Sequence, residues 1–148
     1  MIFDKVSSDI VAAMKAKDKV RLMALRTVKK YFIEAKTAPG ANDELSDEEA
    51  TKILAKLAKQ GRDTADIYVG QSRKDLAEEE LAQVAVIEEY LPKQLTADEL
   101  KAELQALIAQ VGAKGPQDMG KVMGVATKAL VGRAEGKAIS TMVRELLA

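Results

Sequence analysis

The chain carries EYLPKQLTADE at residues 89–99, and this stretch divides it into two helical parts. A proline pushes the preceding residue out of the helical region and lacks a backbone donor, so we expect a helix to end just before Pro92. TADE at residues 96–99 then has the spacing of a capping box, in which two side chains satisfy free amide groups at a helix start. The sequence therefore predicts a helical domain over residues 1–92 and a second over residues 95–148.

Upstream of this break, apolar residues recur every three or four positions, which is the spacing of a helix with one buried face. Two such stripes lie at residues 3–14 and 22–32. A longer stripe follows the capping-box pattern SDEE at residues 46–49 and continues to Gly70, and the next spans residues 76–91. Two long striped helices joined by a short polar segment predict an antiparallel helical hairpin.

Downstream of the break, three shorter stripes are separated by helix-breaking residues. The first ends at Gly112, the second follows Pro116 and the third ends the chain after the glycines at 132 and 136. Glycine is favoured just after a helix and proline in its first turn. The predicted fold class is therefore all-α, with a small C-terminal three-helix bundle behind the N-terminal hairpin domain.

Composition excludes several classes of function. The 148 residues have a formal net charge of zero and contain no cysteine and no histidine. The chain therefore lacks thiolate metal ligands and the commonest general base, and we expect no catalytic residues, no metal and no cofactor. No apolar run approaches the roughly 20 residues that cross a bilayer, and charges interrupt the apolar start. We expect a cytoplasmic protein without a membrane partner.

Two short motifs resemble a known family. EYLPKQL at residues 89–95 and DMGKVMG at 118–124, followed by GRAEG at 132–136, are similar to the signature of the YqeY-like proteins. These are free-standing relatives of the GatB/YqeY domain, which forms the tail of the GatB component of glutamyl/aspartyl-tRNA amidotransferase. The resemblance covers nearly the whole chain and implies an all-helical fold. Because the amidotransferase tail contacts the body of the tRNA, it also implies tRNA or another structured RNA as partner.

The cations of the C-terminal part are the predicted RNA contacts. Lys121 and Lys128 are seven residues apart and share a helical face, and Lys137 and Arg144 repeat that spacing on the next helix. Such faces side by side present a basic ridge to phosphates. The predicted RNA-binding residues are Lys121, Lys128, Lys137, Arg144, Lys114 and Arg133, and the secondary candidates in the basic stretch at 15–36 are Arg26, Lys29 and Lys30.

Three further features have both a structural and a functional interpretation. Gly120 and Gly124 permit close approach of either a neighbouring helix or an RNA backbone, and we expect helix packing. Tyr31 and Phe32 could stack on unpaired bases, but aromatic residues at helical spacing are more often core, which is what we expect. Gly61 stands where the family usually has a basic residue, so a basic contact there is not expected.

The leading interpretation is a non-catalytic RNA-binding accessory module with tRNA as its ligand. One alternative is a protein interaction module that binds a synthetase or amidotransferase subunit, a partner within the tRNA-charging machinery. The other is a carbon–nitrogen ligase with glutamine as amide donor. That reaction needs a glutamine-hydrolysing nucleophile and a site that phosphorylates the acceptor carboxylate, and neither is recognisable. We therefore expect no enzymatic activity, and any ligase label would be inherited from the larger enzyme.

Overall fold

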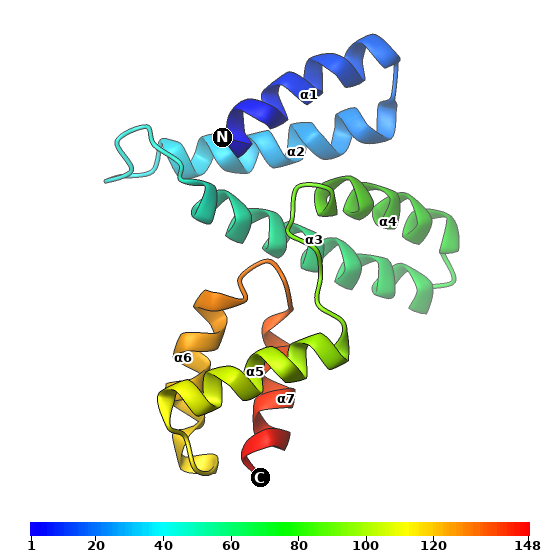
Figure 1. The fold of residues 1–148 in the computed structure, drawn as a ribbon. Helices are drawn as coiled ribbons and strands as arrows, with labels where there is room; N and C mark the ends of the chain where they lie inside the picture. The colour runs from blue at the N-terminus through cyan, green and yellow to red at the C-terminus, as the bar shows by residue number, and fades with distance from the viewer. The chain divides into compact units, whose positions relative to one another are not determined.

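The computed structural model describes all residues from 1 to 148 and contains seven α-helices, a short 3₁₀-helix and no strand (Figure 1). The all-α prediction is confirmed. The chain divides into two compact units, Met1–Leu91 and Pro92–Ala148. Independent folding of the two units stays a prediction.

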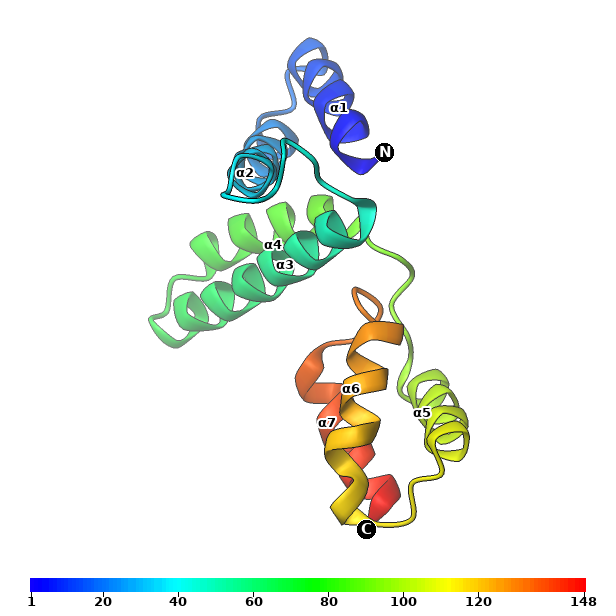
Figure 2. The same cartoon turned by 90° about the vertical axis from the view of Figure 1, so that its left-hand side faces the viewer.

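The first unit contains four helices, α1 (Ile2–Ala16), α2 (Lys19–Lys36), α3 (Asp47–Gly70) and α4 (Lys74–Glu88). Helices α3 and α4 are joined by a short turn and lie side by side along their length, while α1 pairs with α2, and α2 packs on α3 and α4 (Figure 2). Buried apolar side chains from all four helices form the core, chiefly Val6, Leu25, Val28, Phe32, Leu54, Ala58, Val84 and Ile87.

Gly61 decides how closely α3 and α4 approach each other. A Cβ atom at this position would lie 2.4 Å from Cγ2 of Val84 on α4, well inside ordinary carbon contact. Without a side chain, the backbone of α3 packs directly against Val84. This close approach explains a glycine in a helix interior, where it costs about 1 kcal/mol relative to alanine.

The second unit contains α5 (Ala97–Val111), the 3₁₀-helix η1 (Pro116–Asp118), α6 (Met119–Ala129) and α7 (Gly136–Leu147). The predicted capping box is present at the start of α5, and Gly112 ends that helix in the left-handed conformation. The three α-helices contact one another pairwise. They share a core formed by Leu100, Leu104, Val122, Ala126, Leu130, Ile139, Val143 and Leu147.

The segment that joins the units is anchored at both of its ends. Residues 90–91 pack against the core of the first unit. On the other side, the backbone N–H of Leu95 and the side-chain amide of Gln94 donate hydrogen bonds to the carbonyl groups of residues 132–133. Residues 92–93 therefore link a segment held to the first unit with a segment held to the second.

The first prediction concerns the α3–α4 contact. We expect Gly61→Ala to lower the free energy of unfolding by about 1–2 kcal/mol, because the clash with Val84 outweighs the gain in helix propensity. Urea denaturation measures the change, and Val84→Ala in the same chain should recover part of the loss. Gly70→Ala is the matched control, since an added Cβ meets no atom within 4 Å there. Equal stability of the two single variants would contradict the assignment.

The second prediction concerns the joint. Limited trypsin digestion should cut early after Lys93, which is exposed and outside the helices. The two fragments should remain helical by circular dichroism, because each contains its own buried apolar core. Early cutting after Lys36 alone, together with one cooperative unfolding transition for the whole chain, would instead indicate a single integrated domain.

Candidate functional site

Three consecutive side chains, Glu88 and the first two residues of the first family motif, hold the end of α4 to the other helices of the first unit. Each of them bonds to a different helix: Glu88 pairs with Arg62 of α3, Glu89 with Arg21 of α2, and the Tyr90 hydroxyl donates to Asp9 of α1. Side chains engaged in this way are part of the scaffold. The motif therefore positions helices in this chain.

The Tyr90–Asp9 contact has the electrostatics of a structural hydrogen bond. Asp9 accepts from Tyr90 and pairs with Lys5 at 2.9 Å, and these two contacts hold the pKa of its carboxyl below the usual range. Burial, followed by the hydrogen bond to Asp9, raises the pKa of Tyr90. At neutral pH the carboxyl is ionised and the phenol keeps its proton, so neither group is prepared to act as an acid or a base.

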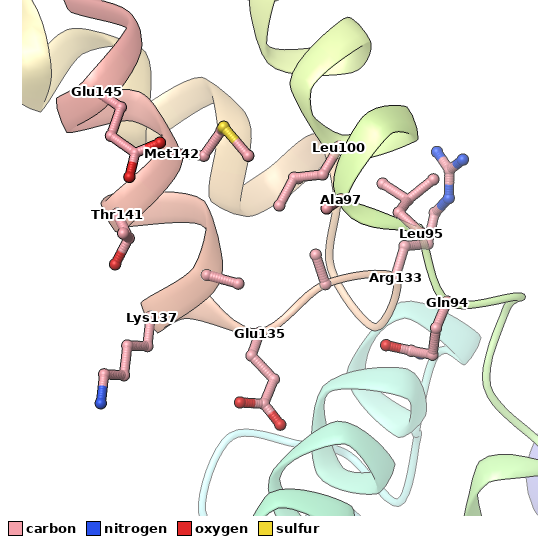
Figure 3. A pocket seen from close by; sticks show the side chains of 12 residues that line it. Gln94, Leu95, Ala97, Leu100, Arg133, Glu135, Lys137, Thr141, Met142 and Glu145 are labelled. Carbon is pink, nitrogen blue, oxygen red and sulfur yellow. The ribbon is translucent and has the colours of Figure 1, made fainter.

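In the second unit, a hollow of about 570 Å³ lies between the start of α5 and α7 (Figure 3). Apolar side chains, among them Leu95, Leu100 and Met142, line much of it. Its charged lining residues have both signs and are Arg133, Glu135, Lys137 and Glu145. The hollow brings together the end of the first motif and the GRAEG motif, which are far apart in the sequence. The apolar periodicity of a single helix does not predict this hollow, because its lining residues come from two separate segments of the chain.

Five of the six predicted RNA-binding cations are exposed: Lys114, Lys121, Lys128, Lys137 and Arg144. On α6 the lysines lie opposite the buried Val122 and Ala126, and on α7 the cations lie opposite the buried Ile139 and Val143. Each pair therefore faces outward from its own helix, as the spacing predicts. Contact with RNA stays a prediction for all of them.

Arg133 differs from the other five predicted contacts. Its side chain is half-buried, and its Nη2 atom lies 3.9 Å from Oε1 of Glu103 on α5. With Lys137, it lines the hollow between α5 and α7. The structure therefore brings Arg133 and Lys137 to one hollow, whereas Lys114, Lys121, Lys128 and Arg144 do not line it.

Comparison with known proteins identifies the family. The sequence pattern of the family described as "Yqey-like protein" matches residues 3–147. The chain belongs to the YqeY-like family. A curated relative is "Altered inheritance of mitochondria protein 41, mitochondrial" of Pyrenophora tritici-repentis (strain Pt-1C-BFP). It is 25% identical over 150 residues, which cover 99% of this chain and 81% of the relative. That relative is named as mitochondrial, and the cytoplasmic location expected for this chain stays a prediction.

Two further structural findings concern metals and membranes in this YqeY-like chain. No group of three or more histidine, cysteine, aspartate or glutamate residues is placed to hold a metal ion. No helix combines the length and the apolar character needed to cross a membrane.

The second family motif has an open surface where helix packing was expected. Neither Gly120 nor Gly124 has any atom within 4 Å of an added Cβ, and both are exposed. The expectation that this pair serves helix packing is wrong, because α5 and α7 contact the opposite side of α6. The backbone is instead bare on the same outer side as Lys121 and Lys128.

The secondary candidates lie on α2 of the YqeY-like fold. Arg26 and Lys30 are exposed, and Lys29 is half-buried. Phe32 is fully buried against Phe3, with ring centroids 6.3 Å apart, which confirms the core assignment for this residue. The same assignment is wrong for Tyr31, whose exposed fraction is 39%. Adjacent positions on a helix point about 100° apart, so only one of the two faces the core.

The third prediction concerns Asp9. A carboxyl with a lowered pKa stabilises the fold above its unfolded-state pKa of about 4, and this contribution disappears as the pH falls through the folded-state value. We expect Asp9→Asn to lower the free energy of unfolding by about 1 kcal/mol at pH 7 and to flatten the loss of stability below about pH 4. Urea denaturation across this pH range measures both effects.

Tyr90→Phe is the companion variant, because it removes the hydroxyl that contributes most to the lowered pKa of Asp9. It should flatten the acid side of the stability profile in the same direction as Asp9→Asn. Profiles parallel to that of the wild type for both variants would show that this hydrogen bond does not couple folding to pH.

Proposed function

We propose that this YqeY-like protein is a non-catalytic RNA-binding accessory module with tRNA as its ligand. In this proposal the second unit acts as a small three-helix bundle, and its outward-facing cations contact phosphates. The observation that carries the proposal is the outer side of α6, where the exposed Lys121 and Lys128 lie beside the bare backbone at Gly120 and Gly124.

The cations of α6 and α7 form no ion pair within the fold, and this supports their role in binding RNA. None of Lys121, Lys128, Lys137 and Arg144 takes part in an ion pair, whereas Arg21 and Arg62 of the first unit are both paired with glutamates. A cation that is already neutralised inside the fold gains less from a phosphate than one that is only hydrated. The fold thus leaves these four charges available to a polyanion.

The bare backbone of α6 adds a steric argument. A nucleic-acid backbone that reaches the lysines of a helix is normally held off by the side chains between them. Gly120 and Gly124 leave part of the α6 backbone beside the lysines without side chains, so a phosphate chain can lie close to the helix there. Lys114 precedes η1 and adds an exposed charge, while Arg133 contributes less because Glu103 lies beside it.

Two other functions remain as alternatives with distinct outcomes. A protein interaction module, with a synthetase or amidotransferase subunit as partner, would form a stable stoichiometric complex that survives nuclease treatment. A carbon–nitrogen ligase would convert glutamate on mischarged tRNA to glutamine, in a reaction that depends on glutamine and ATP. Salt-sensitive binding to folded RNA without such turnover favours the proposed module.

The fourth prediction tests the cations as a set. Replacing Lys121, Lys128, Lys137 and Arg144 with Gln should abolish most tRNA binding, measured by fluorescence anisotropy across a salt series. About four phosphate contacts give the wild type a log–log salt slope of about −3 to −4, and this slope should approach zero in the variant. The melting temperature should change little, because exposed unpaired charges contribute little to stability.

A matched control removes the same number of charges elsewhere. The control replaces four other exposed lysines with Gln: Lys15, Lys17, Lys74 and Lys101. It should keep most of the wild-type affinity, since only general attraction is weakened. If the folded test variant binds tRNA as tightly as the wild type and with the same salt slope, the outer faces of α6 and α7 are not the site.

A further inference from the structure

Two adjoining hollows in the first unit meet at one exposed tyrosine. The first, of about 270 Å³, lies among α2, α3 and α4, and the second, of about 360 Å³, lies between α2 and α3. Tyr31, Leu57 and Gln60 line both of them. Tyr31 therefore stands at the junction of two surface cavities, beside an apolar wall and a side-chain amide.

The Tyr31 ring is available to a ligand. Its exposed fraction is 39%, and its hydroxyl takes part in no hydrogen bond, so nothing in the fold requires this side chain to be a tyrosine. Lys30 places its Nζ atom 5.5 Å from the centre of the ring. A planar apolar surface with a cation beside it suits a flat aromatic group that carries a negative charge nearby.

Among the helices that border the hollows, α2 and the middle of α3 are basic, whereas α4 and both ends of α3 are acidic. Residues 19–36 of α2 and 51–62 of α3 together contain ten lysines and arginines and one acidic residue, Glu34. Some of these cations are engaged, Arg21 and Arg62 with glutamates among them. The exposed cations without an ion pair include Lys19, Arg26, Lys30, Lys56 and Lys59. These unpaired cations of α2 and of the middle of α3 attract a polyanion to this side of the hollows.

The polar lining also fits a nucleobase. Lys56 lines the hollow between α2 and α3 together with Glu34, and Glu80 lines the other. The amide of Gln60 can both donate and accept at a base edge, and a carboxylate can accept from an exocyclic amino group. An aromatic platform, flanking cations and a few hydrogen-bonding groups are the features with which proteins hold single-stranded nucleic acid.

We propose that these hollows form a second RNA contact, in which an unpaired base stacks on Tyr31 while Lys30 and Lys56 bind the adjoining phosphates. The inference rests on the proposed function in taking RNA as the ligand. It differs in the unit, the residues and the part of the RNA: an unpaired nucleotide, rather than the phosphate backbone of the folded body. We call this surface the Tyr31 site.

The experiment uses the full chain and a fluorescein-labelled single-stranded RNA of about twelve nucleotides, a cytidine–adenosine repeat that does not fold on itself. Tyr31→Leu keeps an apolar side chain but removes the ring, and Tyr31→Phe is the matched control that keeps the ring. We expect Tyr31→Leu to weaken binding about ten- to a hundredfold and Tyr31→Phe to stay within about twofold. Thermal melting establishes that both variants are folded.

Salt dependence separates stacking from phosphate contacts. Tyr31→Leu should leave the log–log salt slope unchanged, because it removes no charge. Lys56→Gln should flatten the slope by about 0.7, the value for one phosphate contact on a single strand. A Tyr31→Leu variant that binds the single strand as tightly as the wild type would overturn the inference, and so would wild-type protein that does not bind it.

The outcome is independent of the test made on α6 and α7. If the wild type binds tRNA through the cations of the second unit but does not bind the single strand, the Tyr31 site fails and the proposed function stands. If single-strand binding depends on Tyr31 while the four-cation variant binds tRNA normally, the Tyr31 site stands and the α6–α7 site fails. A wild type that binds neither RNA overturns both.

Discussion

Residues 88–95 form hydrogen bonds with both units of the molecule, through four side chains and one backbone N–H. Glu88, Glu89 and Tyr90 each engage a different helix of the first unit, and Gln94 and Leu95 bond to the GRAEG loop of the second. One short motif thus anchors the end of α4 and the start of the C-terminal unit. The side chains of Glu89, Tyr90 and Gln94 are engaged in these bonds, which is why the best-defined motif in the sequence is part of the scaffold.

Some cations of the chain form ion pairs with carboxylates within the fold, and others do not. Arg21 and Arg62 are paired with glutamates and contribute to the packing of α2, α3 and α4. The cations of α6 and α7, together with Lys30 and Lys56, make no ion pair and can be replaced without loss of an internal salt bridge. The net charge of zero does not reveal this difference, because paired and unpaired cations contribute to it equally. Local pairing, rather than total charge, indicates where a polyanion can bind.

Several features of the fold and site followed from local pattern. Pro92 and the TADE capping box located the break because their effects act on the adjacent backbone. The exposure of Lys121, Lys128, Lys137 and Arg144 followed because each helix turns one striped face inward. The interpretations of Gly120, Gly124 and Tyr31 as packing residues were wrong. Helical spacing gives a direction around the axis, but it does not say whether a neighbour lies there.

The sequence by itself determined the helices, their ends and the outward direction of the cations, because capping, proline geometry and periodicity act within a few residues. Only the tertiary structure decided that Gly61 lies against Val84 and that the α6 glycines face open space. It also decided that Tyr31 lies beside Lys30 and lines a surface hollow together with Lys56. Each of these depends on which helices pack together and how closely. That choice is made by side-chain volumes on elements distant in sequence, which no local pattern records.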